Sequence, residues 1–93
     1  MQHKFLIHDT KDNVGVAVSD IKAGEKIKGE ILEGRKIVEV KAKDNIPLGH
    51  KIALANLDTG ASVIKYGIPI GKTTQQVIVG NHVHVHNLKS RRW

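Results

Sequence analysis

Short stretches in which apolar and polar residues alternate dominate the chain. Residues 14–18, 36–40 and 62–66 are rich in β-branched side chains, several of them with apolar residues at every second position. A two-residue period is typical of a β-strand with one buried face, so we predict strands in these three ranges. Helical patterns are scarce, and only residues 19–22 and 72–76 could each form a single short helical turn.

Glycine recurs between these stretches in a common pattern. The motif apolar-x-x-Gly-x-x-apolar occurs five times, centred on Gly24, Gly34, Gly49, Gly60 and Gly80. Glycine adopts a positive φ at little steric cost, so each pattern predicts a turn between short extended segments. Because their spacing is too irregular for a solenoid, we interpret them as ordinary hairpin turns.

Three of the six histidines stand at alternate positions near the end of the chain, at His82, His84 and His86. On a β-strand these side chains would share one face, with neighbouring residues of the set about 6.6 Å apart. Imidazoles at that spacing can close around one metal ion. The alternative is a polar strand face that is merely rich in histidine.

Composition limits what the chain can do alone. Its 93 residues, 40% of them apolar, predict one domain over residues 1–93 with a thin core, too small to enclose a large active site. The absence of cysteine excludes disulfides and thiolate metal sites, so an ion would need histidine, oxygen ligands or water. No apolar run approaches the ~18 residues that span a bilayer, and we expect a cytoplasmic protein with no membrane partner.

The net charge of +6 favours an anionic partner, such as nucleic acid, an anionic metabolite or the acidic surface of another subunit. Single-stranded nucleic acid requires aromatic stacking platforms, and Phe5, Tyr66 and Trp93 are the only aromatic residues, so we expect no nucleic-acid partner. The basic tail over residues 88–93 combines cations with a tryptophan, as protein interfaces do, and is a candidate docking element. The alternative is a frayed terminus.

Five segments in order carry a resemblance to a known family: residues 12–17, 21–25, 46–54, 65–71 and 83–87. Together they resemble the small SAF-type domain of the altronate and galactarate dehydratase family. Residues 5–9, 14–18 and 87–93 are most similar to the separate small (alpha) subunit of sulfolactate sulfo-lyases.

The resemblance implies a mostly β fold, a β-clip of short bent strands with at most one or two short helical turns. It also implies the small subunit of a metal-dependent lyase, paired with a large catalytic subunit. Such an enzyme eliminates sulfite or water from a small anionic 2-hydroxy acid, with sulfolactate as our preferred substrate and altronate or a related sugar acid as the alternative. The metal of the family is usually Fe²⁺. Whether the chain also forms a homo-oligomer is left open.

Elimination next to a carboxylate needs a base for the proton and a cation for the developing charge. By resemblance, His84 and His86 are the predicted metal ligands, and His82 ranks below them because it lies outside the Val-His-x-His-Asn ending of the family. His50 follows a turn glycine and is the predicted catalytic residue, either contacting substrate or completing the metal shell; the alternative is a histidine bonded to its own turn.

Lys51 and Lys65 are predicted to neutralise a carboxylate or sulfonate of the substrate, and Asn87 is a predicted substrate contact. On a regular strand, Lys65 and Tyr66 would face opposite sides, so both could not line one site.

The two histidines near the N-terminus, His3 and His8, are expected to be surface residues. Asp12 and Asn13 are expected to form a turn before the first long strand.

Two other classes remain open. A binding or assembly module without a catalytic metal would fit a small β-domain equally well. A stand-alone hydrolase is disfavoured because the sequence contains no Gly-x-Ser-x-Gly, no cysteine and no His-Glu-x-x-His.

Overall fold

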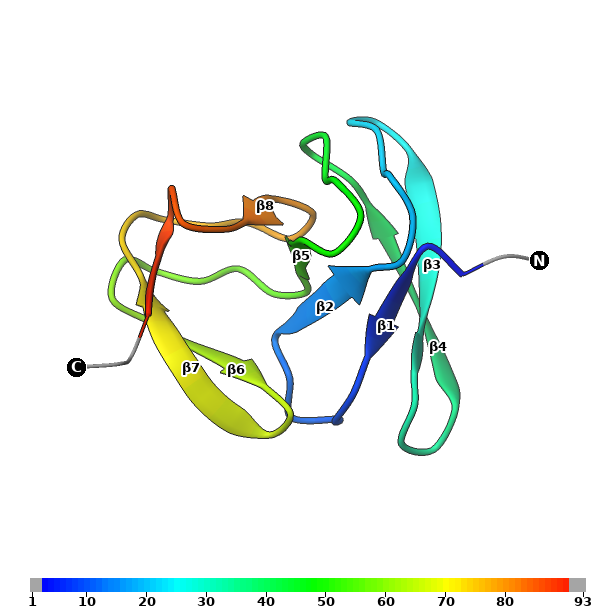
Figure 1. The fold of residues 1–93 in the computed structure, drawn as a ribbon, viewed down its shortest axis with the longest axis horizontal. Coiled ribbons are helices and arrows are strands. Elements are labelled where there is room, and N and C mark those ends of the chain that lie inside the picture. Colours follow the sequence, from blue (N-terminus) through cyan, green and yellow to red (C-terminus); the bar gives the residue numbers. More distant parts are fainter. Residues whose placement is uncertain (1–2, 91–93) are drawn as a thin grey trace.

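The computed structural model describes residues 3–90, which form nine short strands and no helix (Figure 1). The prediction of a mostly β fold is confirmed. Neither range that could have formed a helical turn does so, because residue 21 joins an isolated bridge and strand β7 continues to residue 73. The strands are β1 (Phe5–Ile7), β2 (Val14–Ala17), β3 (Lys26–Ile31), β4 (Lys36–Lys41), β5 (Lys51–Ala53), β6 (Ser62–Lys65), β7 (Ile68–Thr73), β8 (His82–Val83) and β9 (Leu88–Ser90).

These strands form two sheets. Six lie in the order β4-β3-β1-β2-β5-β8, and three in the order β6-β7-β9. Neighbours are antiparallel except β1 and β3, which are parallel. In Figure 1 the β3–β4 and β6–β7 hairpins lie on opposite sides of the molecule, with β1, β2 and β5 between them.

The core contains two apolar clusters, one for each side of the molecule. Phe5 is fully buried at the centre of the first, and its ring occupies the space that side chains at Gly15 and Gly29 would fill. This close approach explains why two strands carry glycine in their interiors, where glycine otherwise weakens a strand. The second cluster consists of Val14, Ala53, Leu57, Val63, Val77 and Val83.

Four of the five glycine patterns form the same turn, over residues 22–25, 47–50, 58–61 and 78–81. In each, the amide of the fourth residue donates to the carbonyl of the first at 3.0–3.1 Å, and the third residue is a glycine with φ between 86° and 94°. This is the type II arrangement, which requires a positive φ at that position. The turns pair through isolated antiparallel bridges between Ile21 and Ile46 and between Leu57 and Val77.

Two of these turns position the histidines. The turn over residues 47–50 ends on His50, and the turn over residues 78–81 leads directly into β8. The second turn is fixed against β5 because the Gly80 amide donates to the carbonyl of Ala53, whose own amide donates to the Asn81 carbonyl, both at 2.9 Å. Pairing of β5 with β8 then brings His50 close to the histidines of the C-terminal segment.

The candidate docking tail is divided by the structure. Its first part is β9, which pairs antiparallel with β7, so this part belongs to the three-stranded sheet. Residues 91–93 of the predicted tail lie outside the described residues.

Candidate functional site

The C-terminal histidines do not lie on one continuous strand. β8 stops before His84, and the segment from His84 to Asn87 forms a turn. The Asn87 side chain closes this turn: its oxygen accepts the His84 amide at 2.9 Å, and its nitrogen donates to the His82 carbonyl at 2.8 Å. The prediction of a single strand face for all three histidines is therefore wrong, because a side chain that bonds local backbone groups competes with strand pairing.

Three histidines converge beside the paired strands β5 and β8. His50 precedes β5, His82 begins β8, and His84 follows β8. The rings of His50 and His84 stack with centroids 3.9 Å apart, and His50 Nδ1 lies 2.8 Å from His82 Nε2. Each of the three offers one nitrogen, and these nitrogens all lie within 4.8 Å of one another. We call His50, His82 and His84 the histidine group. The spacing of these three side chains is suitable for holding one metal ion.

The membership of this group differs in part from the predicted ligand pair. His84 belongs to it, and so does His50, which was predicted as a catalytic or shell residue. His82, ranked lowest by sequence, also belongs, because β-pairing directs it towards His50. His86 lies beside the group, its ring centroid 5.0 Å from that of His82 and tilted by 41°.

Burial and neighbouring imidazoles lower the pKa of two members of this group, His82 and His84. Burial lowers the pKa of His82 below its ordinary value, and His86, His50 and His84 lower it further, against an opposing effect of the Asp44 carboxylate. Partial burial also lowers the pKa of His84, as do nearby His50, Lys51 and His86. The neutral imidazole is the form that binds a metal ion.

Asp44 anchors the entry to β8. One of its carboxylate oxygens accepts the backbone amide of His82 at 2.8 Å and the side-chain amide of Asn81 at 3.0 Å. No sequence pattern singled out this residue, because its partners are 37 and 38 positions away.

Of the two predicted anion-binding lysines, Lys51 lies beside His84, and Lys65 lies near Lys51. Burial lowers the pKa of Lys51, and the positive charge of Lys65 lowers it further. Lys65 ends β6, and its Nζ lies 5.1 Å from the centroid of the Tyr66 ring. The expectation that a regular strand would separate these two side chains does not hold, because Tyr66 has a φ of 58° and leaves the strand.

Tyr66 also stacks on His8, with ring centroids 4.1 Å apart. His8 is half-buried, so the expectation of a surface histidine holds only in part.

Asn87 is 4% exposed, and both ends of its side chain bond the backbone of the histidine turn. The structure therefore places this predicted substrate contact beneath the turn, where it orients His84.

Asp12 and Asn13 hold the β6–β7 hairpin against the N-terminal strands. The Asp12 carboxylate accepts the amides of Tyr66 and Gly67 at 3.1 and 2.8 Å, and the Asn13 side chain bonds the backbone of residues 62 and 64. Asp12 also accepts the Asp9 amide at 3.3 Å, which is the local turn expected from the sequence. Their contacts with the hairpin span 49 to 55 positions, and no local sequence pattern indicated them.

A hollow of about 310 Å³ opens beside the histidine group. It is lined by Lys51, Ile70, His84, Val85, Leu88 and Ser90. His84 and Lys51 therefore border both the histidine group and a space large enough for a small molecule or a side chain.

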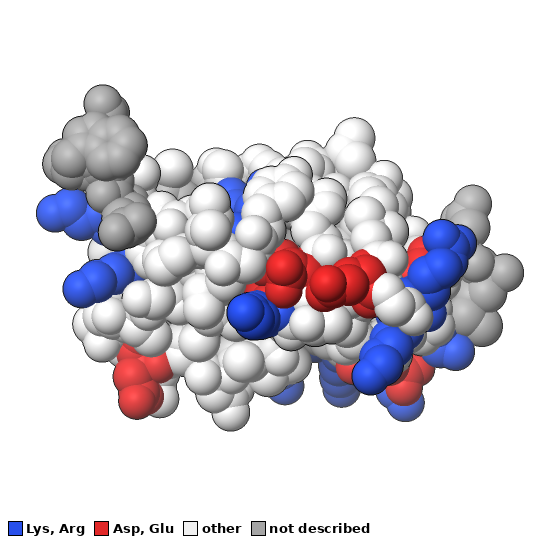
Figure 2. All heavy atoms as spheres, turned by 90° about the horizontal axis from the view of Figure 1, so that it is seen from below, with Lys and Arg blue, Asp and Glu red and all other residues white. Residues whose placement is uncertain are grey.

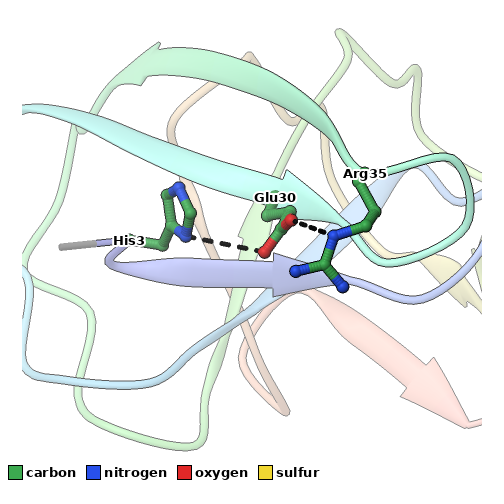
Figure 3. A network of polar contacts seen from close by, with 3 residues as sticks. All are labelled: His3, Glu30 and Arg35. Carbon is green, nitrogen blue, oxygen red and sulfur yellow. Dashed lines mark ion pairs between the residues drawn. The ribbon is translucent and has the colours of Figure 1, made fainter. Parts of the chain in front are cut away.

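His3 takes part in a separate network (Figure 3). Its Nδ1 lies 3.6 Å from one carboxylate oxygen of Glu30, and Nε of Arg35 lies 3.4 Å from the other. These contacts link the segment before β1 to β3 and the β3–β4 turn, and His3 has no part in the histidine group.

The basic residues do not form one continuous stripe on the face seen in Figure 2. They lie in separate groups, with a row of acidic side chains near the middle of that view. Within residues 3–90, none of the segments is a helix of the length and apolarity needed to cross a membrane.

The family model for the altronate/galactarate dehydratase SAF domain matches residues 3–91 of the chain. The chain belongs to this family. It is 40% identical to the (2R)-sulfolactate sulfo-lyase subunit alpha of Chromohalobacter salexigens, over 100% of both chains. It is 54% identical to the protein of the same name from Paracoccus pantotrophus, over 56% of this chain and 78% of that one.

The SAF domain also aligns with longer relatives. Altronate dehydratase of Bacillus subtilis is 41% identical over 92% of the chain, which covers 16% of that enzyme. The relatives are therefore lyases and dehydratases, or subunits of them, which supports a role for this SAF domain in a lyase.

Proposed function

We propose that this SAF domain is the small subunit of a two-subunit, metal-dependent lyase that eliminates sulfite from sulfolactate. The observation that carries the proposal is the end-to-end alignment with a protein named as subunit alpha of a sulfolactate sulfo-lyase. A subunit alpha implies a partner subunit, and in this proposal the partner is a large subunit that carries most of the catalytic groups.

The histidine group fits a divalent cation. Nitrogen ligands at about 2.1 Å from one ion lie about 3.0–3.5 Å from each other. The three imidazole nitrogens lie within 4.8 Å, and the closest pair is 2.8 Å apart, so small ring rotations bring all three into range. The proton that one of these two nitrogens carries would move to the other nitrogen of the same ring, because a neutral imidazole binds a metal through its unprotonated nitrogen.

We therefore assign His50, His82 and His84 as the metal ligands in this proposal. Imidazole suits iron, zinc and nickel alike, and Fe²⁺ follows from the family resemblance alone. His86, predicted as a ligand from the sequence, lies outside the group of three and is available for substrate.

When bound, a divalent cation stabilises the negative charge that develops next to the substrate carboxylate. Lys51 borders the hollow beside His84, and Lys65 is close enough to lower the pKa of Lys51. Two cations of this kind attract a substrate with a carboxylate and a sulfonate, and hold its charged ends against the histidine group. Asn87 acts by orienting His84, and the large subunit supplies the remaining groups.

Co-expression with the large lyase subunit encoded in the same genome tests the function. The complex is assayed anaerobically with Fe²⁺ against sulfolactate and altronate in parallel. Sulfite release from sulfolactate supports the proposal. No turnover of sulfolactate by a complex that contains metal contradicts it.

The alternative is an altronate-type dehydratase, favoured by the 41% identity to altronate dehydratase of Bacillus subtilis. Release of a keto-deoxy sugar acid in the same assay identifies it. A third possibility, an assembly module without a catalytic role, predicts that the purified complex turns over normally when His82 and His84 are replaced by alanine.

A further inference from the structure

The hollow beside the histidine group has the character of a protein-binding surface. We propose that the large subunit docks here, inserting an apolar side chain flanked by a carboxylate. This inference rests on the proposed two-subunit function and adds to it the surface of contact and the chemistry of the partner segment.

The first support is apolar exposure. Val85 is 82% exposed, the highest value among the exposed large hydrophobic side chains of residues 3–90. It stands on the turn that Asn87 closes, so the backbone that presents it is held by three hydrogen bonds. Covering a valine that is already fixed in this way with another apolar surface lowers the free energy of the complex.

The second support is a bulge in the wall of the hollow. In the pairing of β6 with β7, Val63 opposes Gly71 and Ile64 opposes Pro69, which leaves Ile70 without a partner on β6. Bulges redirect a side chain and are common next to functional sites. Here the redirected side chain lines the hollow, where Leu88 adds a third apolar contact.

The third support is charge. The described residues that line the hollow include Lys51 and His84 and no acidic side chain. A carboxylate beside the inserted apolar group would meet Lys51, and the net charge of +6 favours an acidic partner segment in general.

The fourth support is that the site is incomplete. Three imidazoles leave one or more positions of a metal ion open, and the hollow that adjoins them is not enclosed. Because His84 borders both, a segment seated in the hollow excludes water from the histidine group and brings further catalytic groups to it.

The test uses the full chain and the large subunit co-expressed with it, with affinity measured by calorimetry after separation and remixing. Val85→Glu places a charge on the exposed turn opposite the expected carboxylate, and Ile37→Glu is the matched control, since Ile37 is 51% exposed on β4. We expect Val85→Glu to weaken the complex at least ~10-fold and Ile37→Glu less than ~2-fold. Lys51→Glu should also weaken it, whereas Lys28→Glu should not.

Equal affinities for the wild-type chain and Val85→Glu, or equal losses for Val85→Glu and Ile37→Glu, overturn the docking surface and leave the proposed function intact. If the wild-type chain forms no complex with the large subunit, the two-subunit function itself fails. A far-ultraviolet spectrum of each variant verifies that the β fold is retained.

Discussion

Asn87 provides the sharpest test of how the histidine turn is built. Replacing it by alanine removes the acceptor for the His84 amide and the donor to the His82 carbonyl. The side chain is 4% exposed, so water cannot fully replace it without rearrangement of the turn. At about 1 kcal/mol net for each hydrogen bond, plus the space left by the carboxamide, we expect Asn87→Ala to lower the free energy of unfolding by about 2–3 kcal/mol.

For a domain of this size, that loss corresponds to a fall in Tm of about 10–20 °C. Chemical denaturation of the purified chain measures it directly. Asn87→Asp keeps the acceptor but buries a carboxylate whose second oxygen would face the His82 carbonyl, so its loss should be at least as large as that of Asn87→Ala. Asn56→Ala is the matched control, because the Asn56 side chain accepts one amide, that of Val79, at an exposed position, and should cost about 1 kcal/mol or less.

The same variant distinguishes two roles for Asn87. If it orients His84, Asn87→Ala weakens metal binding in the isolated chain together with stability. If the unfolding free energy is unchanged and only the KM for the substrate rises in the assembled enzyme, Asn87 contacts substrate and our reasoning about the turn is wrong.

Three further predictions concern the histidine group and the core. His82→Ala should weaken Co²⁺ binding by about 100-fold or more, and His86→Ala by less than about 3-fold. Titrations monitored by the visible absorption of bound Co²⁺ measure both affinities, and equal losses would contradict the assigned ligand set. Gly29→Ala should destabilise the fold by about 2–3 kcal/mol in urea, because the added methyl group would overlap the buried ring of Phe5. The metal-free chain should lose stability as pH falls through about 6.5, the ordinary histidine pKa. Burial and nearby cations lower the folded-state pKa of His82 and His84, so the unfolded chain binds more protons in that window, and unfolding free energy measured from pH 8 to 5 should decrease; a flat profile would contradict this.

β2, β4 and β6 were predictable because their signal is local. The ranges 14–18, 36–40 and 62–66 correspond to β2, β4 and β6 with shifts of one residue at most. β-branched side chains at a two-residue period need no distant partner to be recognised. The glycine turns were predictable for a similar reason, since a positive φ is a property of the residue itself.

The end of β8 was not predictable from its alternation. Val83 and Val85 have the same spacing as a strand, yet the first is fully buried and the second is 82% exposed. The difference arises because Asn87 bonds the backbone of the preceding residues, and the alternating pattern contains no information about that competing contact.

By itself, the sequence determined that the chain is a small β protein of short strands and glycine turns, with closely spaced histidines near its end. Only the tertiary structure decided which histidines meet. His50 and His82 are 32 positions apart, and they approach because two type II turns are hydrogen-bonded to distant strands and β5 pairs with β8 in one register. A side-chain pattern specifies local conformation, whereas the geometry of this site depends on backbone hydrogen bonds between segments that no local pattern connects.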